Sequence, residues 1–102
     1  MIDLSQLVVA IDTHREGAAV TIRPRIENPT PLTLRYRMTV RQNSAAGTSS
    51  INQQGDLQTG ATGPFVQLSI PPEAKCNIHL ELFQEGTLVK AVDQRCDETA
   101  SN

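Results

Sequence analysis

The sequence is poor in aromatic side chains, with two Phe, one Tyr and no Trp among its 102 residues. Proteins that bind single-stranded nucleic acid stack the bases on such rings. A net charge of −2, from 9 basic and 11 acidic residues, is also unlike a basic nucleic-acid module. The longest local apolar run covers residues 7–11, whereas a membrane-spanning helix needs roughly 18 apolar residues. We therefore expect no nucleic-acid binding and no membrane insertion.

The sequence also lacks the motifs of the common catalytic sites. It has no phosphate-binding glycine loop, no nucleophile elbow and no Ser/His/Asp order. Of its two histidines, His14 is expected in a turn and His79 on the outward side of a strand, so both are expected to be solvated. Glu81 and Glu85 have the spacing of an exposed strand face, unlike two carboxylates held across a cleft. We predict no catalytic residues, no metal site, no cofactor and no enzymatic activity.

A chain of 102 residues is long enough for one modest core, so residues 1–102 are predicted to form a single domain. The polar residues 97–102 are expected to be a disordered tail. A charged start followed by an apolar run, the mark of a secretory signal, is missing. Two alternatives stay open, a cytosolic protein and a mature exported form.

Apolar and polar residues alternate along much of the chain, which is typical of half-buried strands. The clearest strands are residues 20–27 and 32–41, separated by the proline-containing loop 28–31. Pro24 lacks an amide donor, so the first of these strands should be an edge strand or contain a bulge. The other strands are expected at residues 6–12, 49–57, 65–70, 76–84 and 87–95. Strands at this spacing predict an immunoglobulin-like antiparallel β-sandwich of about seven strands, with a small barrel as the alternative.

The segment 43–63 is rich in Gly, Ser, Thr, Gln and Asn. Such a composition buries little surface, which favours flexible loops around a short edge strand. It also suits a segment that pairs edge to edge with another polar strand. Both interpretations are kept.

Cys76 and Cys96 are the only cysteines, and they lie at the far ends of the last two predicted strands. A turn at Glu85 and Gly86 pairs residues whose numbers sum to about 171 or 172, which brings the two cysteines together. A disulfide there would stabilise the fold by roughly 3 kcal/mol and imply an oxidising compartment. The alternative is a pair of reduced, buried thiols in a cytosolic protein.

Basic residues are concentrated in one part of the chain. Five of the seven arginines fall within 19 positions, and no acidic residue occurs between Asn28 and Gly55. By strand parity the arginines form two outward groups, which are Arg23 and Arg25 on one strand and Arg35, Arg37 and Arg41 on the next. They are either ordinary solubilising side chains or a surface that attracts an acidic partner. The two groups separate if their strands belong to different sheets.

The segment 21–57 resembles the CsgC/CsgH group of curli-system proteins, and within it the CsgH members most. The likeness lies in the Arg-x-Arg strand end at Arg23 and Arg25, the basic strand 34–38, and the polar stretch followed by residues 68–70. It implies a periplasmic, monomeric immunoglobulin-like protein that keeps the curli major amyloid subunit from polymerising.

By the same resemblance, electrostatic contact with early aggregates falls to Arg35, Arg37 and Arg41, with Arg23 and Arg25 in support. Other members carry a Cys-x-Cys pair linked to redox chemistry, whereas here the cysteines are 20 residues apart. A structural disulfide therefore fits better than redox activity. The remaining alternatives are a structural or accessory subunit of a surface fibre and a periplasmic thiol oxidoreductase.

Overall fold

The structure is a computed structural model that describes residues 5–60, 64–71 and 73–96. Within these ranges the chain forms seven antiparallel β-strands and no α-helix. The strands are β1 (Val8–Glu16), β2 (Ala19–Glu27), β3 (Thr33–Ser44), β4 (Gly47–Gln58), β5 (Val66–Ser69), β6 (Lys75–Gln84) and β7 (Thr87–Arg95). The described part of the chain offers no helix that could cross a membrane. Residues 97–102, predicted to form a disordered tail, lie outside the described ranges.

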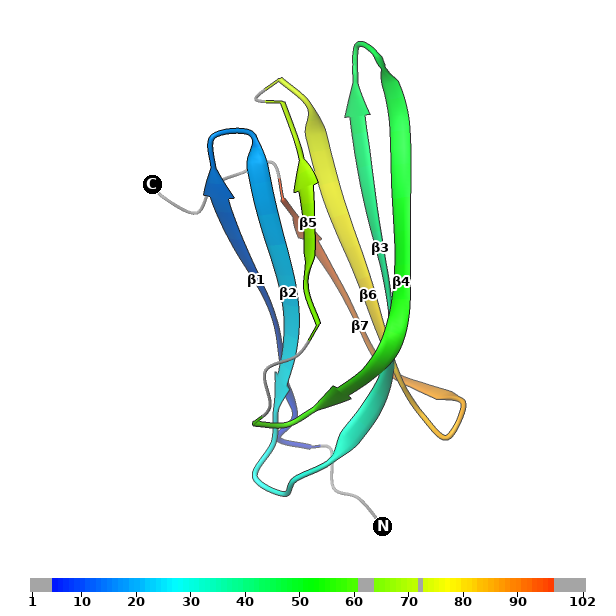
Figure 1. The fold of residues 1–102 in the computed structure, drawn as a ribbon. Coiled ribbons are helices and arrows are strands. Elements are labelled where there is room, and N and C mark those ends of the chain that lie inside the picture. The colour runs from blue at the N-terminus through cyan, green and yellow to red at the C-terminus, as the bar shows by residue number, and fades with distance from the viewer. Residues whose placement is uncertain (1–4, 61–63, 72, 97–102) are drawn as a thin grey trace.

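The strands form two sheets that pack face to face (Figure 1). One sheet has the order β1-β2-β5, and the other has the order β4-β3-β6-β7. Consecutive strands pair in the hairpins β1–β2, β3–β4 and β6–β7, whereas the β2–β5 and β3–β6 pairs are crossovers. This arrangement confirms the predicted immunoglobulin-like sandwich and excludes the small barrel.

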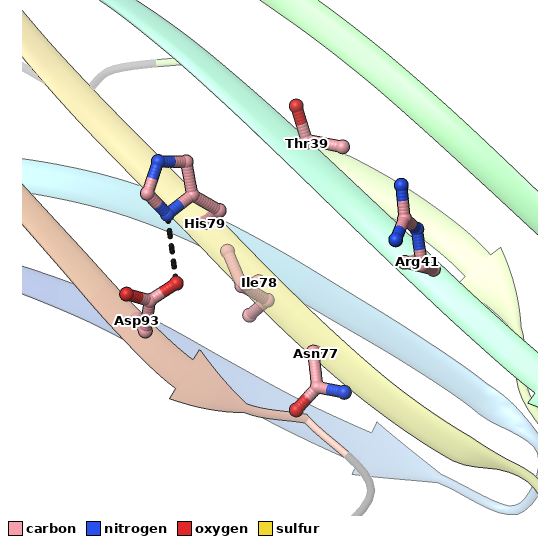
Figure 2. A pocket seen from close by; sticks show the side chains of 6 residues that line it. All are labelled: Thr39, Arg41, Asn77, Ile78, His79 and Asp93. Carbon is pink, nitrogen blue, oxygen red and sulfur yellow. Dashed lines mark hydrogen bonds and ion pairs between the residues drawn. The ribbon is translucent and has the colours of Figure 1, made fainter.

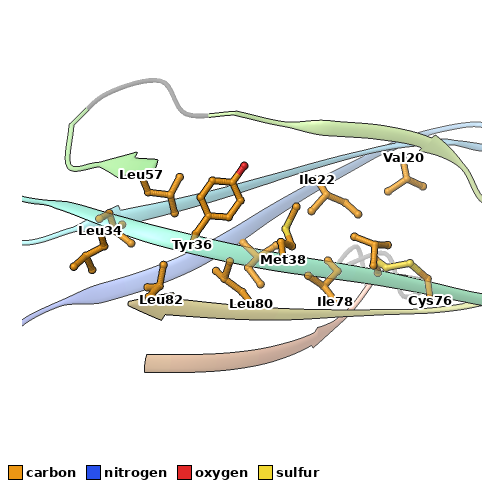
Figure 3. Packing of buried hydrophobic residues seen from close by; sticks show 14 of the residues in the cluster. Val20, Ile22, Leu34, Tyr36, Met38, Leu57, Cys76, Ile78, Leu80 and Leu82 are labelled. Atoms are coloured by element: carbon orange, nitrogen blue, oxygen red, sulfur yellow. A yellow bond between two sulfur atoms is a disulfide. The ribbon is translucent and has the colours of Figure 1, made fainter. Parts of the chain in front are cut away.

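Alternation along the strands builds the core, because every second side chain points into the space between the sheets. In β3 the residues Leu34, Tyr36, Met38 and Val40 are buried, and the residues between them face outward. Figure 3 shows Leu34, Tyr36 and Met38 beside core side chains of β2 and β6. Each fully buried aliphatic side chain contributes roughly 1.5–3 kcal/mol. Among the described residues no polar or charged residue is buried, so the sandwich is closed by apolar contact.

The prediction that Pro24 marks an edge strand or a bulge was wrong, because β2 is the central strand of its sheet and pairs with β1 without a shift in register. The short β5 pairs only with residues 19–22 of β2, so the part of β2 that holds Pro24 has β1 as its one neighbour. Counting from the two-residue turn between Glu16 and Ala19, Pro24 falls in a non-hydrogen-bonded pair with Ile11. Its nitrogen therefore faces the uncovered side, where no donor is required.

Three strands extend two or more residues beyond their predicted limits, namely β1, β4 and also β3, which continues to Ser44. β1 continues to Glu16, which places His14 in an exposed strand position and corrects the predicted turn. β4 spans twelve residues and pairs with β3 along its whole length, so most of the polar segment is ordered strand. A glycine helps to fit it there, because a Cβ on Gly55 would lie 3.3 Å from Cε1 of the buried Tyr36 ring.

The β6–β7 hairpin has the predicted turn, with positive φ at Glu85 and Gly86. Paired residue numbers sum to 172 from Asn77–Arg95 onward and to 171 beyond a bulge at Leu82 and Phe83. Cys76 and Cys96 form the predicted disulfide, with a Cα–Cα distance of 5.0 Å. It joins the end of β6 to the residue after β7, so it closes one end of the four-stranded sheet.

Candidate functional site

The predicted client-binding arginines are divided between the two sheets. Arg23 and Arg25 lie on β2 in the three-stranded sheet, whereas Arg35, Arg37 and Arg41 lie on β3 in the four-stranded sheet. All five alternate with buried residues and so point away from the core. We call the outer surface around the first pair the three-stranded face and that around the other three the four-stranded face. The sandwich separates these faces, so the arginines do not form one patch.

On the three-stranded face, Arg25 is neutralised by neighbouring carboxylates. Its Nε donates a hydrogen bond to Asp12 at 2.7 Å, and its Nη1 is paired with Glu27. The bond to Asp12 is the main cause that raises the pKa of Arg25. Arg23 lies over the ring of Phe65, with its guanidinium carbon 5.6 Å from the ring centre. This face therefore presents little unbalanced positive charge near Arg25.

On the four-stranded face the register decides which side chain lies beside each arginine. Arg35 is paired with Asp56 of β4 and Phe83 of β6, and Arg37 with Gln54 and Glu81. For Arg41 the paired residues are Ser50 and Asn77, which carry no charge. In the described ranges, ion pairs are found for Arg37 but not for Arg35 or Arg41. Positive charge is thus least compensated at the Arg41 end.

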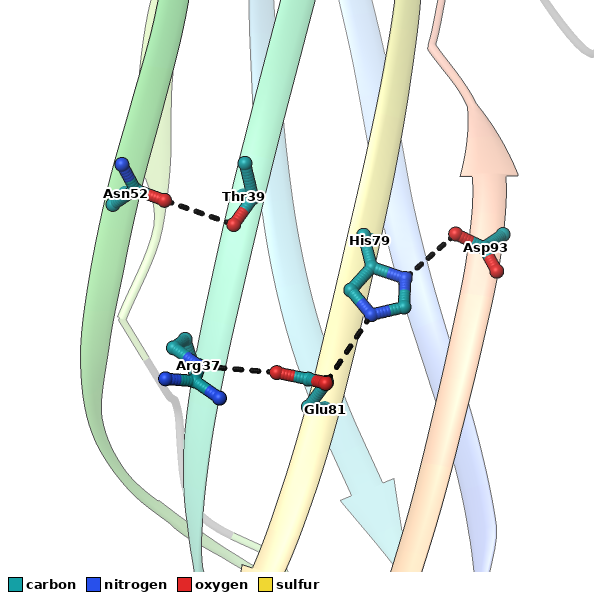
Figure 4. Close-up of polar contacts among 6 residues, drawn as sticks. All are labelled: Arg37, Thr39, Asn52, His79, Glu81 and Asp93. Carbon is teal, nitrogen blue, oxygen red and sulfur yellow. Dashed lines mark hydrogen bonds and ion pairs between the residues drawn. The ribbon is translucent and has the colours of Figure 1, made fainter. Parts of the chain in front are cut away.

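Four charged or ionisable side chains form a network across this face (Figure 4). Arg37 Nε donates to Glu81 at 3.0 Å, His79 Nε2 lies 3.5 Å from the other Glu81 oxygen, and His79 Nδ1 lies 2.7 Å from Asp93. The hydrogen bond with Asp93 is the main cause of a raised pKa at His79. The bond from Arg37 is the main cause of a lowered pKa at Glu81. Arg37 also lies 5.4 Å from the centre of the Phe83 ring.

Beside Arg41 the surface is hollowed into a depression of about 400 Å³ between β3 and β6. Its lining residues are Thr39, Arg41, Asn77, Ile78, His79 and Asp93 (Figure 2). The depression is only partly enclosed, so it suits a side chain of a larger partner better than an enclosed small molecule. No group of metal-binding residues occurs in the part of the chain that the structure describes.

The outward direction of the five arginines was predicted from the sequence, but the acidic and aromatic side chains beside them were not. The predicted β6–β7 register already pairs His79 with Asp93, because these numbers sum to 172. No comparable signal linked Arg37 to Glu81, since that contact depends on the β3–β6 crossover. The site can bind carboxylates through guanidinium groups.

No family model matches the sequence, and no curated protein matches it. Solved structures share its fold, and two of them are a CsgH and a CsgC. The solution structure of R. palustris CsgH is 19% identical, with a TM-score of 0.70 over 90% of this chain and 94% of that one. The E. coli curli protein CsgC is 16% identical, with a TM-score of 0.66 over 88% of this chain and 97% of that one. The chain therefore has a CsgC/CsgH-like fold, as the sequence resemblance predicts.

Proposed function

We propose that this protein is a chaperone-like inhibitor of curli amyloid assembly. Its client is the curli major amyloid subunit, and it acts in the periplasm on early aggregates without enzymatic chemistry. The fold likeness to CsgH and to the curli protein CsgC supports a role in the curli system. The disulfide between Cys76 and Cys96 agrees with an oxidising compartment.

The observation that carries the proposal is the incomplete neutralisation of the four-stranded face. Arg35, Arg37 and Arg41 point outward from one strand, and only Arg37 has an ion pair within the described residues. Such a face attracts an acidic polypeptide and speeds its encounter, an effect that salt weakens. Because amyloid grows by adding strands to exposed edges, transient contact with an early aggregate can delay growth without a catalytic pocket.

In this proposal Arg23 and Arg25 form a second, weaker contact. They lie on the opposite face of the sandwich, and two carboxylates already occupy Arg25. A client segment held by Arg35, Arg37 and Arg41 would not reach them at the same time.

The test is thioflavin-monitored polymerisation of purified curli major subunit with this protein added well below equimolar. We expect a long delay that shortens in high salt. The variant Arg35→Gln, Arg37→Gln, Arg41→Gln should lose most of the delay, and Arg23→Gln, Arg25→Gln is the matched control on the other face. Circular dichroism establishes that both variants fold. An undiminished delay with the triple variant would remove the four-stranded face from the mechanism.

A second candidate is a structural or accessory subunit of a surface fibre. The long β4 lies at the rim of its sheet and could join a neighbouring subunit. Sedimentation distinguishes the candidates, because a fibre subunit assembles as its concentration rises and the proposed inhibitor stays monomeric.

A further inference from the structure

The sandwich has four edge strands, and they differ in how well they are protected. β5 has four residues. β7 contains a bulge, in which Val89 has no partner on β6, and it carries Lys90, Asp93 and Arg95. On β1 the carbonyl of Ile11 accepts a hydrogen bond of 3.0 Å from the Gln94 side chain. Short length, charge, bulges and side-chain covering are the usual ways to stop a sheet from adding another strand.

β4 has the fewest of these protections. It has twelve residues, no Lys, Arg or Pro, and a continuous register with β3. Its single charged residue is Asp56. In Figure 1 it forms the outer rim of the four-stranded sheet.

The register identifies which backbone groups of β4 face the open rim. Ser44 and Gly47 flank the two-residue turn and form a hydrogen-bonded pair, so the pairs that follow alternate. The β4 residues in the non-hydrogen-bonded pairs direct their N–H and C=O groups away from β3. They are Thr48, Ser50, Asn52, Gln54, Asp56 and Gln58. This row has the spacing of one side of a β-ladder.

Gln53, on the core-facing side of β4, has a buried polar atom beside the rim. The Oε1 atom of Gln53 is buried and has no hydrogen-bond partner among the described residues. A buried acceptor without a partner is costly. An added strand whose inward side chains are hydroxyls or amides could supply the missing donor.

Charge beside the rim specifies a further feature of the partner. Arg41 is paired with Ser50. Because the Ser50 side chain is small, it does not block the Arg41 guanidinium from extending toward the rim. A strand added to β4 would lie about 10 Å from β3, two strand spacings away. A long arginine and a glutamate can together span that distance.

We propose that β4 is a docking edge for an extended polypeptide strand, rich in hydroxyl and amide side chains, with a carboxylate opposite Ser50. The backbone pairing is independent of the proposed function, and only the contact with Arg41 uses the same face. Direct binding is therefore the appropriate test, since it requires no curli subunit.

The probe is the capped heptapeptide TQSESQT, in which Gln, Glu and Gln share one side of the strand. In a ¹⁵N NMR titration we expect shifts and slowed hydrogen exchange at the amides of Thr48, Ser50 and Asn52. The same peptide with N-methyl groups on its Gln, Glu and Gln residues should not bind. Asn52→Pro, which removes one rim N–H, should weaken binding about tenfold. Asn52→Ala keeps that N–H and should bind like the wild type.

Replacing the peptide Glu by Gln should weaken binding severalfold in the wild type and have no effect in Arg41→Gln. Equal binding of the N-methylated peptide would overturn strand addition and leave only electrostatic contact. If the same amides shift with protein concentration alone and sedimentation shows a dimer, β4 pairs with a second copy and the proposal is wrong.

Discussion

The two outer faces carry arginines in the same alternating pattern but differ in what surrounds them. On the three-stranded face, Arg25 is held by Asp12 and Glu27. On the four-stranded face, Arg41 is flanked by Ser50 and Asn77, and neither has a charge to offset it. Arg37 lies between these extremes, with one carboxylate and one aromatic ring nearby.

This difference shows that an arginine pattern alone does not define a basic surface. The residues on the neighbouring strands decide whether each positive charge is neutralised, and strand pairing selects those residues. Asp12 is paired with Arg23 in register yet bonds diagonally to Arg25. A diagonal neighbour is within reach of a long side chain on the same face of a sheet.

The largest expected effect is loss of the disulfide, which constrains the four-stranded sheet only. In Cys76→Ala, Cys96→Ala the free energy of unfolding should fall by about 3 kcal/mol, because the bond closes a loop of 20 residues. Guanidinium denaturation measures this fall, and the reduced wild type is the control. NMR shifts of Asn77 should change, whereas those of Asp12 should not. An unchanged unfolding free energy would mean that the bond does not stabilise the native sheet.

Ser50→Asp makes the four-stranded face resemble the other one, because it places a carboxylate beside Arg41. We expect it to shorten the delay of curli subunit polymerisation several-fold, through neutralisation of the guanidinium. Ser50→Asn, which is close in size and uncharged, is the matched control. An equal delay for both variants would show that the charge of Arg41 is not used.

Asp12→Asn is the reverse change, since it removes the main partner of Arg25. The three-stranded face should then bind poly-glutamate more tightly by a small factor, measured by NMR shifts around Arg25. Wild-type protein in the same titration should respond mainly on the four-stranded face. If the two proteins give the same shifts at Arg25, the ion pair does not limit access to it.

The smallest expected effect is the pH dependence of the unfolding free energy, which should arise from the four-stranded face. Because the pKa of His79 is raised in the native state, this side chain stabilises the fold below pH 6.5. The stabilisation is lost as the pH rises through the higher native pKa. Because the pKa of Glu81 is lowered in the native state, this side chain stabilises the fold above pH 4.5. The stabilisation is lost as the pH falls through the lower native pKa. Both contributions are present between about 4.5 and 6.5. Urea midpoints should decline slightly above this window, and His79→Gln should remove that decline.

The strands could be predicted from sequence because burial alternates with period two. The spacing of Leu34, Tyr36, Met38 and Val40 is enough to define β3, and the turn at Glu85 and Gly86 sets the β6–β7 register. The length of β4 could not be predicted in this way. Its Gly, Ser and Gln residues have weak strand preference, and pairing with all of β3 stabilises it.

The arginines of the candidate site could be predicted from the sequence, but the residues around them could not. Their outward direction follows from parity, but their division between two sheets depends on crossovers that local sequence does not encode. The Arg37–Glu81 contact joins residues 44 positions apart. A single sequence contains no signal for such a pairing, because each strand could pair with any of several other strands.

The separation of the apolar interior from the polar exterior also affects how such proteins evolve. The arginines of both faces lie outside a core in which no described polar residue is buried. Selection for folding and selection for partner choice therefore act on different positions. Surface residues can be exchanged generation after generation while the alternation that fills the interior persists. Two solved structures with only 16–19% identity to this chain share its fold at TM-scores of 0.66–0.70.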